Sequence, residues 1–183
     1  PSLADLHGPA LDADANADVV VDTHMRTAGA WVANPPSPLP GDLVINELMI
    51  DPAETSDAEG EYIELRNSSE DWVEFGGLRL RDWGVDDSPI VPLGPAMSVI
   101  GPGAYFVVCA TGDYWSNGGV DCDATISYST WGEGFALSNQ EDEVLLTTSQ
   151  GVDIDSLVYD SSLGAPGEAT GVDPGASSVS GTA

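Results

Sequence analysis

The stretch that decides the fold is "GDLVINELMIDPAETSDAEGEYIELRNSSEDWVEFGGLRLRDW", residues 41–83. Its apolar runs LVINELMI, EYIELRN and GLRLRDW are short, and polar turns separate them. In the second and third runs apolar and polar residues alternate, which is the pattern of a strand with one buried face. The alternation predicts that Ile63, Leu65, Leu78 and Leu80 face the core and that their neighbours face outward.

The rest of the chain up to residue 160 repeats this texture of short strands and turns. No stretch has a convincing helical period. Turn signals such as NSSED, IGPG, SNGG and TSQG separate the apolar runs. Runs of this length and spacing favour an all-β fold, an antiparallel sandwich or barrel. Strands are predicted near residues 43–50, 61–67, 72–75, 77–82, 97–100, 104–110, 124–130, 143–148 and 153–159.

The two flanks differ in composition from the core at residues 41–160. Residues 1–40 are rich in Ala, Asp and Pro and end in the linker-like NPPSPLPG. Within them ADVVVDTHM, residues 17–25, is predicted as a strand that adds to its own sheet or to a neighbouring subunit. Residues 161–183 are a Gly/Ala/Ser-rich tail or the start of a final strand. A chain that starts at Pro1 is expected to be processed or cut from something longer.

The charge balance is extreme, with 31 acidic residues against four basic ones and a formal net charge of −27. Such a surface repels phosphate backbones and anionic lipid heads, so nucleic acid is excluded as a partner. No run of about 18 apolar residues is present, so membrane insertion is not expected. The charge favours cations, and calcium is the expected one outside a cell. Adaptation to high salt produces the same composition and stays open as an alternative.

Two cysteines, Cys109 and Cys122, are separated by a short loop. The first lies in a predicted strand and the second just before one. This pattern favours a disulfide in an exported protein, and hence an extracellular or cell-surface location. Closing a loop of this size contributes roughly 3 kcal/mol in the chain-entropy model. The alternative is one buried thiol and one idle thiol.

Four motifs follow one another along the core: LVINELMIDP, GEYIELRNSSEDWVEFGGLRLRD, IGPGAYFVVCATG and STWGEGFALSNQEDEVLLTTSQGVDIDSLVYD. Together they resemble the lamin tail domain family, in its prokaryotic extracellular branch, over residues 41–160. The resemblance implies an immunoglobulin-like antiparallel β-sandwich of about seven to nine strands with no intrinsic catalysis. Such prokaryotic domains look like accessory modules of secreted hydrolases or surface proteins. The acidic surface departs from any nucleic-acid role implied by nuclear lamins.

The loop between the first two core strands is crowded with carboxylates: Asp51, Glu54, Asp57, Glu59 and Glu61. Calcium takes six to eight oxygen ligands, and a short acidic loop can supply many of them. Asp51, Asp57, Glu59 and Glu61 are therefore the candidate calcium ligands. The alternative is a solvated acidic loop that binds no ion.

Glu47 and Glu64 lie inside the two strands that flank this loop. One interpretation is a carboxylate pair for acid–base catalysis, as in glycosidases. The favoured interpretation is structural, because three of the four arginines fall on neighbouring strands and can form cross-strand ion pairs. The expected ion pairs join Arg66, Arg79 or Arg81 to Glu64, Glu61 or Glu74.

Both histidines lie within the first 24 residues, so the core lacks the histidine that a catalytic triad or a zinc site needs.

The loop TGDYWSNGGVDCDAT, residues 111–125, carries the candidate partner-binding residues Tyr114 and Trp115. Their rings can stack on a sugar or on a partner surface. The remaining tryptophans are expected to be packed or half-packed: Trp31, Trp72, Trp83 and Trp131.

These observations predict a non-enzymatic module of an exported prokaryotic protein, acting in adhesion, tethering or surface display, with calcium as a candidate stabiliser. Its partner is a protein or glycan surface, or further copies of itself. One alternative is a structural subunit of an extracellular fibre or layer, assembled by N-terminal strand donation. Another is an accessory domain of a larger secreted hydrolase.

Overall fold

The computed structural model describes residues 36–94, 98–129, 133–160 and 169–171 of the chain. Within these ranges it has twelve strands and one helical turn. They are β1 (Leu43–Met49), α2 (Asp57–Gly60), β2 (Tyr62–Asn67), β3 (Val73–Glu74), β4 (Arg79–Arg81), β5 (Asp87–Pro89), β6 (Val91–Pro92), β7 (Val99–Ile100), β8 (Tyr105–Cys109), β9 (Ala124–Thr125), β10 (Glu141–Thr147), β11 (Asp153–Asp160) and β12 (Ala169–Gly171).

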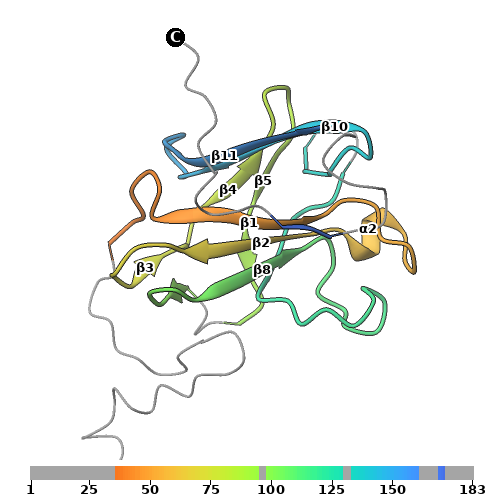
Figure 1. The fold of residues 1–183 in the computed structure, drawn as a ribbon, viewed down its shortest axis with the longest axis horizontal. Helices are drawn as coiled ribbons and strands as arrows, with labels where there is room; N and C mark the ends of the chain where they lie inside the picture. The colour runs from red at the N-terminus through yellow and green to blue at the C-terminus, as the bar shows by residue number, and fades with distance from the viewer. Residues whose placement is uncertain (1–35, 95–97, 130–132, 161–168, 172–183) are drawn as a thin grey trace, which may run out of the picture.

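The strands form two main layers, visible one above the other in Figure 1. One layer is a six-stranded sheet in the order β12-β1-β2-β8-β9-β6, and the other is a four-stranded sheet in the order β11-β10-β4-β5. The short pair β3-β7 forms a third sheet. All the pairings are antiparallel except β8 with β9. The predicted all-β class and the immunoglobulin-like sandwich are confirmed.

The core lies between the two layers and follows the alternation read from the sequence. Ile63, Leu65, Leu78 and Leu80 are all buried, as predicted. They meet buried side chains of β1, β8, β10 and β11 in one continuous cluster. Because successive side chains of a strand point to opposite faces, one apolar face on each sheet is enough to build this cluster.

A bulge in β1 sets how the two layers are joined. The β1–β2 register shifts between Ile45 and Glu47, which leaves Asn46 as an extra residue. At this point the Ile45 N–H donates to Asp155 Oδ2 of β11 at 2.7 Å. Burial raises the pKa of Asp155 above its usual range, and hydrogen bonds from backbone N–H groups oppose this shift. One carboxylate therefore links β1 of the six-stranded sheet to β11, the end strand of the four-stranded sheet.

The short strands differ from the prediction. β5, β6 and the helical turn α2 were not expected, and the strand predicted at residues 124–130 ends at Thr125. Both β5 and β6 contain proline, and β5 also contains aspartate. These residues have low strand propensity, so the partner strands place β5 and β6 more than their own sequences do. The chain leaves the sheet after Thr125, and the Phe135 N–H donates to the Ser127 carbonyl.

Two predicted features of the flanks have different outcomes. The strand predicted at residues 17–25 lies outside the described residues. In the C-terminal segment 161–183, β12 pairs with β1 opposite residues 47–49. A final strand is therefore present in that segment, and it covers part of the outer edge of β1.

Candidate functional site: an aromatic loop fastened by a disulfide

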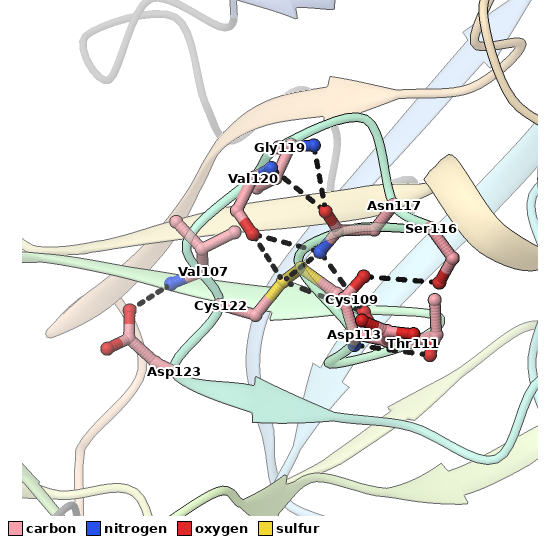
Figure 2. Close-up of a disulfide and its surroundings, with 10 residues drawn as sticks. All are labelled: Val107, Cys109, Thr111, Asp113, Ser116, Asn117, Gly119, Val120, Cys122 and Asp123. Carbon is pink, nitrogen blue, oxygen red and sulfur yellow. Dashed lines mark hydrogen bonds between the residues drawn. A yellow bond between two sulfur atoms is a disulfide. The ribbon is translucent and has the colours of Figure 1, made fainter.

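The loop that connects β8 to β9 is closed by the predicted disulfide. Cys109 and Cys122 are bonded with their Cα atoms 6.0 Å apart (Figure 2). Beneath the loop, Val107 and the two cysteines form a second, smaller apolar cluster, against which Tyr62 and Val120 pack. The disulfide therefore fastens both ends of the loop to the outer face of the six-stranded sheet.

Asn117 holds the middle of this loop. Its side chain is buried, and its Nδ2 donates to the Val120 carbonyl at 2.9 Å and lies 3.1 Å from Cys122 Sγ. Its Oδ1 accepts from the N–H groups of Gly119 at 3.1 Å and Val120 at 2.9 Å (Figure 2). Gly118 and Gly119 have φ angles of 82° and 87°, which a side chain would disfavour. The loop thus has one well-defined path.

Asp113 organises the turn that presents the aromatic pair. Its Oδ1 accepts from the Trp115 N–H at 3.1 Å, and its carbonyl accepts from the N–H groups of Ser116 and Asn117. Tyr114 is 50% exposed and Trp115 is 90% exposed. Their rings meet edge to face with centroids 5.5 Å apart. Both predicted partner-binding residues therefore lie together in solvent on a fixed loop.

The predicted calcium ligands lie around the turn α2 but differ in burial. Asp57 and Glu59 belong to α2, whereas Glu61 follows it and is only 3% exposed. Glu61 Oε2 accepts from the Leu137 N–H at 2.9 Å, and its Oε1 has no hydrogen-bond partner. Burial raises the pKa of Glu61 to about 8, and the nearby carboxylates of Asp57, Asp142 and Asp51 act in the same direction. Glu61 is therefore mainly neutral at pH 7.

These carboxylates do not form a ready-made ion site. Across the described ranges, no group of three or more His, Cys, Asp or Glu side chains is placed to hold a metal ion. Calcium binding by Asp51, Asp57, Glu59 and Glu61 stays a prediction.

Glu47 and Glu64 stand directly opposite each other on β1 and β2. Glu47 Oε1 accepts from the Tyr62 hydroxyl at 2.5 Å, and Glu64 Oε1 accepts from Asn46 Nδ2 at 2.7 Å. Neutral donors on the same two strands thus hold both carboxylates. This arrangement supports the structural interpretation over the catalytic pair.

The arginine partners differ from those expected. Arg79 Nε lies 2.5 Å from Asp87 Oδ1, and Arg81 Nε lies 3.9 Å from Asp87 Oδ2. The glutamate partners predicted for Arg79 and Arg81 are therefore wrong. The reason is that β5 was not predicted, and its pairing with β4 places Asp87 directly opposite Arg81. Arg66 instead lies 6.0 Å from the centre of the Tyr105 ring.

Sequence reasoning also missed an exposed tryptophan. Trp83 was expected to be packed or half-packed, but it is 70% exposed at the tip of the β4–β5 hairpin. The segment DWGVD, residues 82–86, could have indicated this exposure, because it connects β4 to β5. It can be recognised as a hairpin tip only if β5 is predicted. Trp72 is half-buried, as expected, and Trp31 and Trp131 lie outside the described residues.

The family described as Lamin Tail Domain matches residues 36–161, well over half of the chain. The chain belongs to the lamin tail domain family. The match begins just before β1 and ends after β11, so it includes the aromatic loop and every described strand of this lamin tail domain except β12. No curated protein matches the chain. In the part of this lamin tail domain that the structure describes, no helix has the length and apolar composition needed to cross a membrane.

Proposed function

We propose that this lamin tail domain is a non-enzymatic tethering module of an exported prokaryotic protein, and that it binds neutral glycan surfaces through Tyr114 and Trp115. The observation that carries the proposal is the 90% exposure of Trp115 on a loop fixed by a disulfide and by Asn117. When a partner covers a large apolar side chain that was exposed to water, the free energy of the system falls, which favours binding.

The fixed path of the loop also favours binding. A loop that is already ordered loses little conformational entropy when a ligand docks, so more of the contact energy appears as affinity. The Tyr114 and Trp115 rings contact each other edge to face, and Trp115 at 90% exposure keeps most of its indole accessible for stacking.

A neutral glycan suits both the rings and the charge of the domain. Aromatic faces stack on the C–H faces of sugar rings, and the exposed Asp113 carboxylate can accept hydrogen bonds from sugar hydroxyls. An uncharged polymer is not repelled by a net charge of −27, whereas an acidic polysaccharide is. The disulfide supports an oxidising location, outside the cell or at its surface.

Affinity electrophoresis tests this proposal, because a strongly acidic protein migrates fast in a native gel and binding retards it. Gels containing hydroxyethylcellulose, xyloglucan or mannan would be compared with a gel containing carboxymethylcellulose. We expect the wild type to be retarded in at least one neutral gel. The affinity for that polysaccharide should be about tenfold or more lower in Trp115→Ala.

Trp83→Ala is the matched control, since it also removes one exposed tryptophan without changing the charge. Absence of retardation in every neutral gel, or equal retardation of the wild type and Trp115→Ala, would reject the glycan proposal. Hydrolysis of a glycan that is lost in Glu47→Gln or Glu64→Gln would reject the non-enzymatic part.

Calcium stabilisation is a separate part of the proposal. It is supported by the gathering of Asp51, Asp57 and Asp142 around Glu61. These side chains would have to move to share one ion. Isothermal titration of the whole chain with CaCl₂ tests this, and we expect heat that is lost in the Asp57→Asn, Glu59→Gln double variant. A signal that survives in that variant would place the ion elsewhere.

One observation favours a second candidate, a fibre or layer subunit assembled by strand donation. β12 pairs with β1 only opposite residues 47–49, and among the described residues no other strand pairs with this edge, which is met at Ile45 by the Asp155 side chain of β11 instead. Light scattering of the whole chain and of a chain lacking residues 1–35 tests it, and assemblies that form without those residues would reject donation. The third candidate, an accessory domain of a secreted hydrolase, predicts catalytic sequence beyond these termini in the full-length gene.

A further inference from the structure

The tip of the β4–β5 hairpin presents a second apolar surface, away from the aromatic loop. Trp83 is 70% exposed and Val85 is 77% exposed, with one glycine between them. In Figure 1 this tip projects from the layer of β10 and β11, whereas the loop at residues 110–122 projects from the opposite side of the sandwich. The two surfaces can therefore contact different partners at the same time.

The hairpin tip is held in place by three backbone donors. The Asp82 N–H donates to the Asp86 carbonyl at 3.2 Å, and the Asp86 N–H donates to Asp82 Oδ1 at 3.0 Å. The Trp83 N–H donates to Glu143 Oε1 at 2.8 Å, which ties the tip to β10, 60 residues further along the chain. The backbone that carries the indole is therefore held in place before any ligand arrives.

Several carboxylates lie on the turn that carries this indole and on the neighbouring strand β10. Asp82 and Asp86 flank the tip, and Glu143 reaches it from β10. Burial and the charge of Asp82 raise the pKa of Asp86, and burial together with the charges of Glu143 and Asp82 raises the pKa of Asp142. The nearest arginines on this hairpin, Arg79 and Arg81, contact Asp87 instead. The tip thus combines an exposed aromatic ring with several carboxylates on the same turn and on β10.

We propose that the Trp83 tip docks an arginine or lysine side chain of a basic partner polypeptide. A guanidinium or ammonium group above the indole face gains a cation–π interaction. The same group is attracted by the carboxylates of this tip, and arginine can bind a carboxylate with two parallel hydrogen bonds. With four arginines, no lysine and a net charge of −27, this chain has few cations of its own to offer such a site.

A lipid surface is the less suitable occupant. Tryptophan and valine at a hairpin tip can enter the headgroup region, but here Asp82, Asp86 and Glu143 would accompany them. Moving carboxylates toward hydrocarbon is costly, and anionic headgroups repel them. A cationic side chain instead gains from every one of these charges.

Fluorescence anisotropy of the whole chain with a labelled nona-arginine peptide, at 0.15 M salt, tests the proposal. Any acidic protein attracts this peptide, so the comparison is between variants of equal charge. We expect the Kd to rise at least about threefold in Trp83→Ala, which corresponds to the lower range of a cation–π contact. Trp115→Ala is the matched control and should bind like the wild type. Glu143→Gln keeps an acceptor for the Trp83 N–H and should bind more weakly than Glu70→Gln, a variant of the same net charge at an exposed turn.

Equal Kd values for the wild type, Trp83→Ala and Trp115→Ala would overturn the proposal, because binding would then depend on net charge alone. A blue shift of tryptophan fluorescence on phosphatidylcholine vesicles, lost in Trp83→Ala, would reassign the tip to a membrane surface. The glycan proposal is independent, since Trp83→Ala is expected to leave retardation in neutral polysaccharide gels unchanged.

Discussion

Glu61 carries a carboxyl group in an environment with few interactions that would stabilise its ionised form. It is buried, one of its oxygens accepts a single backbone hydrogen bond, and the other has no partner. The groups that face it are the carboxylates of Asp51, Asp57 and Asp142, with the hydroxyls of Tyr128 and Tyr159 nearby. The neutral acid is therefore the form compatible with this packing.

This burial predicts a stability that falls as the pH rises. The pKa of Glu61 is about 8 in the folded chain, against 4.5 for the unfolded group. Below pH 4.5 both states are protonated, and above that value only the unfolded state releases the proton. The penalty grows from pH 4.5 to pH 8 and reaches about 4 kcal/mol.

Urea unfolding of the wild type and Glu61→Gln at pH 5, 7 and 9 measures this effect. We expect the variant to gain stability relative to the wild type as the pH rises, because glutamine does not ionise. The other acids contribute to both proteins and largely cancel in this difference. Parallel pH profiles would show that Glu61 is not the titrating group.

At the scale of elements, the contact between β1 and β11 rests on Asp155. Replacing it with alanine leaves the Ile45 N–H without its acceptor, which costs about 1–3 kcal/mol. Urea unfolding measures the loss, and we expect a smaller one in Asp155→Asn, which keeps an acceptor. Asp153→Ala is the control, because Asp153 is exposed on the same strand. A loss of the same size in the control would remove the special role of Asp155.

The disulfide supports both the stability of the domain and the aromatic loop. We expect the Cys109→Ala, Cys122→Ala double variant to lose roughly 3 kcal/mol, since the unfolded chain regains the entropy of an open loop. Retardation in neutral polysaccharide gels should weaken as well, because Tyr114 and Trp115 lose their fixed positions. A variant that is destabilised but fully retarded would show that the Asn117 contacts alone hold the loop.

The elements also show which parts of the fold sequence reasoning can reach. Strands such as β2 and β4 were predicted because Ile63, Leu65, Leu78 and Leu80 alternate with polar residues. β5 was missed because Asp87–Pro89 carries no such signal and is placed by its pairing with β4. That single omission also concealed the Asp87 ion pairs and the exposure of Trp83, since both depend on the hairpin.

At the scale of the whole molecule, the charge of −27 opposes the compact state. Salt screens this repulsion over about 10 Å at 0.1 M, so we expect the Tm to rise between 0.05 M and 1 M NaCl. Differential scanning calorimetry checks this, with an uncharged osmolyte as the control for general solvent effects. A Tm that does not change with salt would mean that the acidic side chains are spaced widely enough to avoid one another.

The candidate sites differ in how far the sequence alone can predict them. Tyr114 and Trp115 could be proposed because they are neighbours in a polar loop. The burial of Glu61 could not, because it depends on the Leu137 backbone, 76 residues away. Sites built from one loop are thus readable in the sequence, whereas sites built from several elements require the fold.

The bond between Ile45 and Asp155 joins residues 110 positions apart. Contacts between such distant segments raise the contact order of the domain. Folding is slower at high contact order, because the entropy of closing a long loop is lost before the stabilising contacts form. During synthesis at roughly 5–20 residues per second, β1 would wait on the order of ten seconds for β11 to emerge. The edge of β1 is exposed for that time, so the nascent chain depends on its acidic side chains to remain apart from its neighbours.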